Sequence, residues 1–128
     1  APAAPRVLEV MGRRLAIAAA AKGVARFTFA ELCEWPLGAA DFVAIAEAFH
    51  TVVLAGIPRL APERRDATKR FATLVDVLYE RKIKLVCSAA AAPQEIHPQG
   101  EHAFEFRRTA SRLMEMQSVE YLQQGGAD

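Results

Sequence analysis

The sequence has little of what marks several functional classes. Its 128 residues include only two cysteines, Cys33 and Cys87, which stand far apart and form no Cys-x-x-Cys pair. This excludes a disulfide scaffold or a cysteine-based metal site, and we expect two buried thiols of a cytosolic protein. No stretch reaches the roughly 18 apolar residues that a membrane span needs. The first residues do not place a basic region before an apolar one, so we expect no secretory signal.

An excess of charge is also absent. Sixteen Lys and Arg residues against fifteen Asp and Glu residues give a net charge of +1. Such a balance provides no global field for nucleic acid, and we expect no nucleic-acid partner. The length fits one domain, residues 1–128, with disordered tails at 1–6 and 123–128. Because the sequence does not begin with Met, we expect it to be part of a longer protein.

Motifs for self-sufficient catalysis are missing as well. There is no Gly-x-x-x-x-Gly-Lys-Ser/Thr phosphate loop, no dinucleotide-binding glycine pattern and no Gly-x-Ser-x-Gly motif. His97 and His102 lie five positions apart, but no neighbouring cysteine or acidic pair completes a metal site. Taken alone, the sequence therefore predicts no complete active site and no bound metal.

The clearest positive feature is an apolar, then amphipathic, then apolar pattern over residues 51–88. Residues 51–57 and 83–88 are near-continuous apolar runs, typical of parallel strands covered on both faces. Between them, Phe71, Leu74, Val75 and Leu78 recur at helical spacing, which predicts a crossover helix of about 18 residues beginning near Pro62 and Glu63. The fold class predicted is α/β, with a partly parallel sheet, an N-terminal β-hairpin and a C-terminal helix.

The other segments are predicted more briefly. Strands 7–11 and 15–18 flank a turn at 12–14, residues 19–23 form a loop, and a half-buried strand covers 24–29. Residues 31–36 form a short helical fragment or turn, and 38–50 a helix. Residues 89–100 form a connection, 103–106 a short strand and 109–122 the terminal helix.

Three arginines, Arg107, Arg108 and Arg112, are predicted near the start of this terminal helix. Positive side chains there oppose the helix dipole, and arginine in such a place is often held for an anion. A solvated basic turn paired with Glu105 and Glu115 is the alternative, which composition favours.

Three further polar residues have structural explanations, and one of them, Ser88, also has a functional one. Ser88 ends a predicted parallel strand, where open α/β sheets bind ligands, or it simply terminates the strand. Asp41 and Asp76 are on predicted helices and are explained as surface or capping residues.

Several stretches together resemble the carboxyl-terminal part of the ZapE-like P-loop ATPases, the group of bacterial ZapE and mitochondrial relatives. The resemblance runs from Val7 to Leu122, and its order and spacing are specific. Its main matches are Pro36-Leu37-Gly38, Phe49-His50-Thr51-Val52, Lys69-Arg70-Phe71, Leu74-Val75-Asp76, Lys84-Leu85-Val86, Phe104-Glu105-Phe106-Arg107-Arg108-Thr109 and Ser111-Arg112-Leu113-Met114-Glu115-Met116-Gln117-Ser118.

The resemblance implies an ATPase parent, linked to cell division, whose phosphate loop and metal-binding carboxylates precede residue 1. ATP and Mg²⁺ are expected in that parent and none on this fragment. Arg112 is the best candidate for a nucleotide-sensing or trans-acting arginine, followed by Arg108 and Arg70, and Ser88 with Arg112 would contact the nucleotide. Expected partners are the rest of the ATPase chain, further copies and division proteins. The expected location is the cytoplasm, with peripheral association at the inner membrane left open.

Two other functions remain open from the sequence. A protein-interaction module would bind a division protein or a protease substrate through a face carrying Phe27, Phe29 and Trp35. A freestanding, degenerate nucleotide binder would bind ATP with these 128 residues alone.

Overall fold

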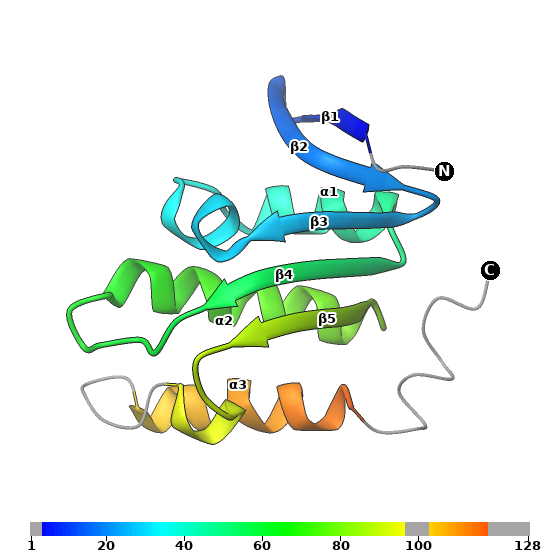
Figure 1. The fold of residues 1–128 in the computed structure, drawn as a ribbon. Helices are drawn as coiled ribbons and strands as arrows, with labels where there is room; N and C mark the ends of the chain where they lie inside the picture. Colours follow the sequence, from blue (N-terminus) through cyan, green and yellow to red (C-terminus); the bar gives the residue numbers. More distant parts are fainter. Residues whose placement is uncertain (1–3, 97–102, 118–128) are drawn as a thin grey trace.

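The computed structural model of the chain describes residues 4–96 and 103–117. They contain one five-stranded sheet in which the order in space equals the order in sequence (Figure 1). The strands are β1 (Ala4–Val10), β2 (Arg13–Ala21), β3 (Val24–Thr28), β4 (Thr51–Ile57) and β5 (Lys84–Ala89). Strands β1, β2 and β3 pair antiparallel, whereas β3, β4 and β5 are parallel. The predicted α/β class with a partly parallel sheet is confirmed.

The helices form one layer against this sheet. They are the π-helix η1 (Ala30–Glu34), α1 (Ala39–Ala48), α2 (Arg65–Glu80), the 3-10 turn η2 (Pro93–Glu95) and α3 (Ala103–Glu115). Helices α1 and α2 lie behind the sheet in Figure 1, and α2 packs between α1 and α3. Leu113 of α3 and Met116 directly after it line the same cavity as Leu85 of β5, so α3 continues the layer. No helix within the described ranges is long and apolar enough to span a membrane.

The predicted central unit of strand, helix and strand is confirmed. Val52 and Leu54 of β4 are fully buried against the helices, whereas Val53 and Ala55 are only partly buried. The expectation that β4 is covered on both faces is therefore wrong for the described part of the chain. Helix α2 begins at Arg65 instead of near Pro62.

The N-terminal hairpin is confirmed, but its turn is tighter than predicted. Val10 pairs with Arg13 across a two-residue turn of Met11 and Gly12, whose φ angles are +50° and +80°. Two residues with positive φ match the twist of the flanking strands, which explains the tight connection. Strand β1 begins at Ala4, so residues 4–6 belong to the sheet instead of a disordered tail. Residues 1–3 and 123–128 lie outside the described residues.

Residues 19–21 also form strand instead of the predicted loop. Ala19, Ala20 and Ala21 pair with β3, and the turn follows at residues 22–23. Alanine has low strand propensity, but pairing with a neighbouring strand overrides that preference.

The expected strand at residues 103–106 is wrong, because these residues form the first turn of α3. Phe106 is 4% exposed and Phe104 is 79% exposed, as expected for side chains two positions apart on a helix. The Phe106 ring stacks on Phe71 of α2 with 6.2 Å between centroids, and Phe71 also contacts Phe29 at 5.8 Å. Helix α3 ends at Glu115, and residues 118–122 of the predicted helix lie outside the described residues.

The Asp41 side chain is buried instead of lying on the surface. It is 2% exposed and accepts hydrogen bonds from the Gly38 backbone N–H at 2.8 Å and from Arg13 at 2.7 Å. Asp41 thereby caps α1 and fastens the hairpin to it.

Candidate functional site

The strongest concentration of charged contacts lies between α2 and α3. We call it the α2–α3 cluster, and its members are Asp76, Tyr79, Arg108, Arg112 and Glu115. Asp76 accepts a hydrogen bond from the Arg112 guanidinium, and its second carboxylate oxygen lies 3.7 Å from Arg108. The Asp76 side chain is 34% exposed, Arg112 21% and Arg108 66%. One carboxylate thus faces two arginines of very different exposure.

Tyr79 fixes the other side of Arg112. The guanidinium carbon of Arg112 lies 4.9 Å from the Tyr79 ring centroid, a cation–π distance. The Tyr79 hydroxyl donates a hydrogen bond to the Glu115 carboxylate, and this bond raises the pKa of Tyr79. Arg112 is therefore held between a carboxylate and an aromatic ring.

Helical spacing explains why these side chains meet. Asp76 and Tyr79 are three positions apart on α2, while Arg108, Arg112 and Glu115 are four and three positions apart on α3. Such spacings place side chains on one face of each helix.

The prediction that Arg112 lies near the start of a helix and opposes its dipole is wrong. Helix α3 begins at Ala103, so Arg112 lies in its last turn, where a cation complements the dipole. The helix begins six positions before the predicted Thr109, which places Arg112 away from its start.

The other two predicted site residues lie in separate contacts. Arg70 donates a hydrogen bond to the backbone carbonyl of Cys33 in η1 at 3.3 Å. The Ser88 hydroxyl accepts a hydrogen bond from the Gly56 backbone N–H at 2.9 Å, beside the register shift between β4 and β5. Arg108 and Arg112 thus meet, whereas Arg70 and Ser88 have structural partners elsewhere. Their roles in catalysis or nucleotide binding stay predictions.

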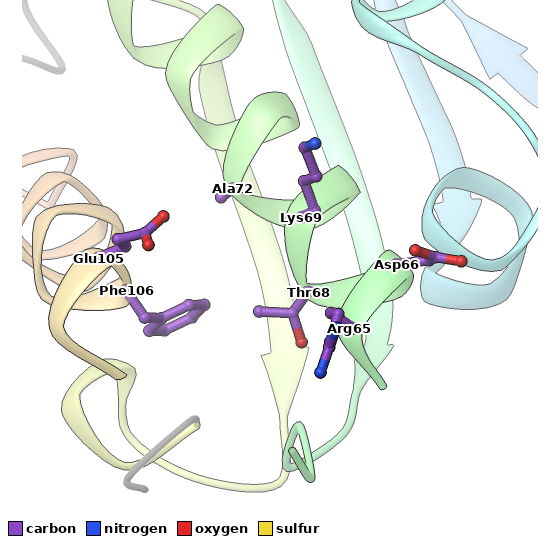
Figure 2. A pocket seen from close by; sticks show the side chains of 7 residues that line it. All are labelled: Arg65, Asp66, Thr68, Lys69, Ala72, Glu105 and Phe106. Atoms are coloured by element: carbon purple, nitrogen blue, oxygen red, sulfur yellow. The ribbon is translucent and has the colours of Figure 1, made fainter. Parts of the chain in front are cut away.

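A cavity of about 350 Å³ lies between the first turns of α2 and α3. It is lined by Arg65, Asp66, Thr68, Lys69, Ala72, Glu105 and Phe106 (Figure 2). In Figure 2 the Phe106 ring points toward Thr68, whereas Asp66 points away from α3. The Thr68 hydroxyl already donates to the Arg64 carbonyl at 2.7 Å. Balanced charges and a satisfied hydroxyl give this cavity no clear ligand preference.

This cavity is not predicted from the sequence, because the alternating pattern of residues 103–106 indicates a strand, whereas these residues form the first turn of α3. The one indication of a helix here is the position of Phe104 and Phe106 on opposite sides of a helical turn. Within residues 4–96 and 103–117, no group of three or more His, Cys, Asp or Glu side chains could hold a metal. His97 and His102 lie outside the described residues.

The cysteines differ from each other, so the expectation of two buried thiols is half wrong. Cys33 is fully buried, and desolvation raises its pKa to about 12. Cys87 is exposed on β5. Neither is an activated nucleophile.

Comparison with known proteins identifies the family. The model of the AFG1-like ATPases matches residues 1–125. The chain belongs to the AFG1-like ATPase family. It is 39% identical over 115 residues to the cell division protein ZapE of Escherichia coli, covering 90% of this chain and 31% of that protein. It is 34% identical over 149 aligned positions to the lactation elevated protein 1 homolog B of Danio rerio, covering 91% of this chain and 30% of that protein.

This AFG1-like chain thus spans about a third of the length of these relatives. No solved structure matches it at a significant level.

The alternative of a protein-interaction module is weakened, because most of the surface expected for it is buried. Phe27 is 2% exposed and Phe29 is 3% exposed, so both belong to the core and cannot form the interaction face expected from the sequence. Trp35, at 48% exposure, is the only one of the three that faces solvent.

Proposed function

We propose that this chain is the α/β portion of an ATPase that hydrolyses ATP in its full-length form and acts in cell division. Membership of the AFG1-like family and the similarity to ZapE support this proposal. ATP and Mg²⁺ are bound by the remainder of the protein. The chain acts in the cytoplasm and contributes an arginine element and a subunit interface.

The contact between Asp76 and two arginines supports the choice of site. Arg112 is mostly buried and oriented by Asp76, while Arg108 on the same face is 66% exposed and within reach of an external anion. Phosphoryl transfer is accelerated by cations placed on the developing charge, and an arginine from a separate element can supply one. We assign Arg108 to the phosphate and Arg112 to positioning it through their shared carboxylate.

Substitution in the full-length ATPase tests this assignment. We expect Arg108→Ala and Arg112→Ala each to lower ATP turnover by at least about tenfold, because loss of such a cation usually costs far more. Arg107→Ala is the matched control, since Arg107 is exposed next to them and lies over the Phe104 ring at 5.9 Å. Circular dichroism verifies that each variant is folded. Normal turnover in folded Arg108→Ala and Arg112→Ala proteins would exclude the catalytic role.

A nucleotide-independent interaction module is the second candidate, and the exposed Trp35 is the observation that favours it. It predicts that Trp35→Ala abolishes capture of a purified division protein without nucleotide. Capture unaffected by Trp35→Ala would exclude this surface.

A further inference from the structure

One face of the parallel sheet carries no helix within the described residues, as Figure 1 shows for the side toward the viewer. The strand registers place Arg26, Val53 and Val86 in one row across β3, β4 and β5. Parallel rows contain Val24, Thr51 and Lys84, and Thr28 with Ala55. We call these eight residues the open sheet face.

Four of the eight side chains on the open sheet face are apolar, namely Val24, Val53, Ala55 and Val86. Val86 is 57% exposed, and its row neighbour Val53 is only partly buried. All-parallel sheets have both faces covered by helices, and three strands of this mixed sheet, β3, β4 and β5, are parallel. Here both connecting helices, α1 and α2, lie on the same side, so neither covers the open sheet face.

The side chains of this face also constrain what covers it. Its only charged members are Arg26 and Lys84, and it contains no carboxylate. Small and β-branched side chains form a flat surface on which helices pack well. A helical layer with an apolar centre and acidic residues at its rim fits both the shape and the charge.

The relatives provide a source for this layer. The chain corresponds to 30% of the Danio rerio protein and 31% of the Escherichia coli protein, so about two thirds of each relative lies outside the matched region. A second copy of this chain would place Arg26 and Lys84 against the same cations. Charge therefore favours the remaining ATPase chain over a second copy.

We propose that the open sheet face is the docking surface for helices contributed by the rest of the AFG1-like ATPase chain. The proposal rests on the proposed function in that it assumes an ATPase chain longer than these 128 residues. It assigns the α1–α2–α3 side to the arginine element and the opposite side to intramolecular packing.

Thiol labelling of the full-length protein tests the proposal. In a Cys87→Ser background, Val86→Cys places a thiol on the open sheet face, and Met11→Cys places one at the exposed hairpin turn, where Met11 is 84% exposed. Peptide-resolved mass spectrometry follows maleimide labelling at each position. We expect Val86→Cys to react at least about tenfold more slowly than Met11→Cys, because access limits thiol reactions. Arg26→Cys, in the same row, replaces Val86→Cys if the latter does not fold.

Each outcome has a defined meaning. Labelling of both face positions within about threefold of Met11→Cys overturns the proposal. Protection that disappears when the protein is diluted to monomers identifies a second copy as the occupant and also overturns it. ATP turnover, measured separately on the same variants, reports on the proposed function, since docking and hydrolysis can fail independently. Slow labelling at every dilution supports intramolecular docking.

Discussion

Gly23 lies in the turn between β2 and β3, directly against the ring of His50. Its φ angle is +79°, and a Cβ atom built on it would lie 2.5 Å from the His50 ring. Its carbonyl accepts the backbone N–H groups of His50 and Thr51 at 3.0 and 3.3 Å. This turn therefore joins the antiparallel and parallel parts of the sheet, and the contact leaves no room for a side chain.

Gly12 provides a matched comparison because its φ angle is +80° but nothing lies within 4 Å of its Cβ position. We expect Gly12→Ala to lower the free energy of unfolding by about 1 kcal/mol, the cost of a left-handed backbone alone. Gly23→Ala should cost at least about 1 kcal/mol more, because the added methyl group clashes with His50. Urea denaturation measures both. Equal losses would show that the His50 ring moves aside at no cost.

The raised pKa of Tyr79 predicts that the stability of the fold depends on pH. Its hydrogen bond to Glu115 raises the pKa of Tyr79 above the ordinary tyrosine pKa of about 10. The contribution of this bond to the stability of the fold is therefore complete at pH values below that ordinary pKa. It is lost as the pH rises through the higher pKa of the folded state. The difference in tyrosinate absorbance between wild type and Tyr79→Phe isolates this titration.

We expect Glu115→Gln to shift that titration to lower pH. Glu80→Gln, an exposed substitution at the end of α2, should leave it unchanged. A Tyr79 titration insensitive to Glu115→Gln would contradict the hydrogen bond as the cause.

At the scale of the element, α3 joins the core through one face. Phe106, Ala110, Leu113 and Met116 are each at most 6% exposed, and they recur at helical spacing. Phe104 is on the opposite side. The helix is therefore attached by a single apolar stripe together with the α2–α3 cluster.

The two phenylalanines of α3 give a direct test of this arrangement. Phe106→Ala should lower the free energy of unfolding by about 3 kcal/mol, because it removes a buried ring that stacks on Phe71. Phe104→Ala should change it by no more than about 0.5 kcal/mol. Chemical denaturation of both variants is the measurement, and equal losses would instead favour a strand with both rings buried.

Elements with long hydrophobic patterns were predicted well. Strand β4 and helix α2 have many apolar residues in phase, and their existence and order follow from the sequence. Residues 103–106 were wrongly predicted as a strand, because four residues of alternating hydrophobicity fit a strand and a helical turn equally well. The pairing of Asp76 with Arg112 could not be predicted, since it depends on how two helices pack. For the same reason, the sequence did not predict that Arg70 and Ser88 lie apart from the α2–α3 cluster.

At the scale of the whole molecule, nucleotide binding separates the proposed function from a freestanding nucleotide binder. We expect calorimetry of these 128 residues with Mg-ATP to give no binding, because they contain no phosphate-loop motif. The full-length protein under the same conditions is the positive control. A saturable heat of binding from the 128-residue chain would show that it binds nucleotide by itself and would contradict the proposed function.

The agreement of strand order with sequence order has a consequence for synthesis. Each strand pairs with the one before it, so every new strand leaving the ribosome meets a partner that has already emerged. The sheet can then grow from one edge: two-residue turns close the antiparallel pairs, whereas longer crossovers that contain α1 and α2 close the parallel pairs. Strand β5 is added last, and α3 follows it to complete the helix layer.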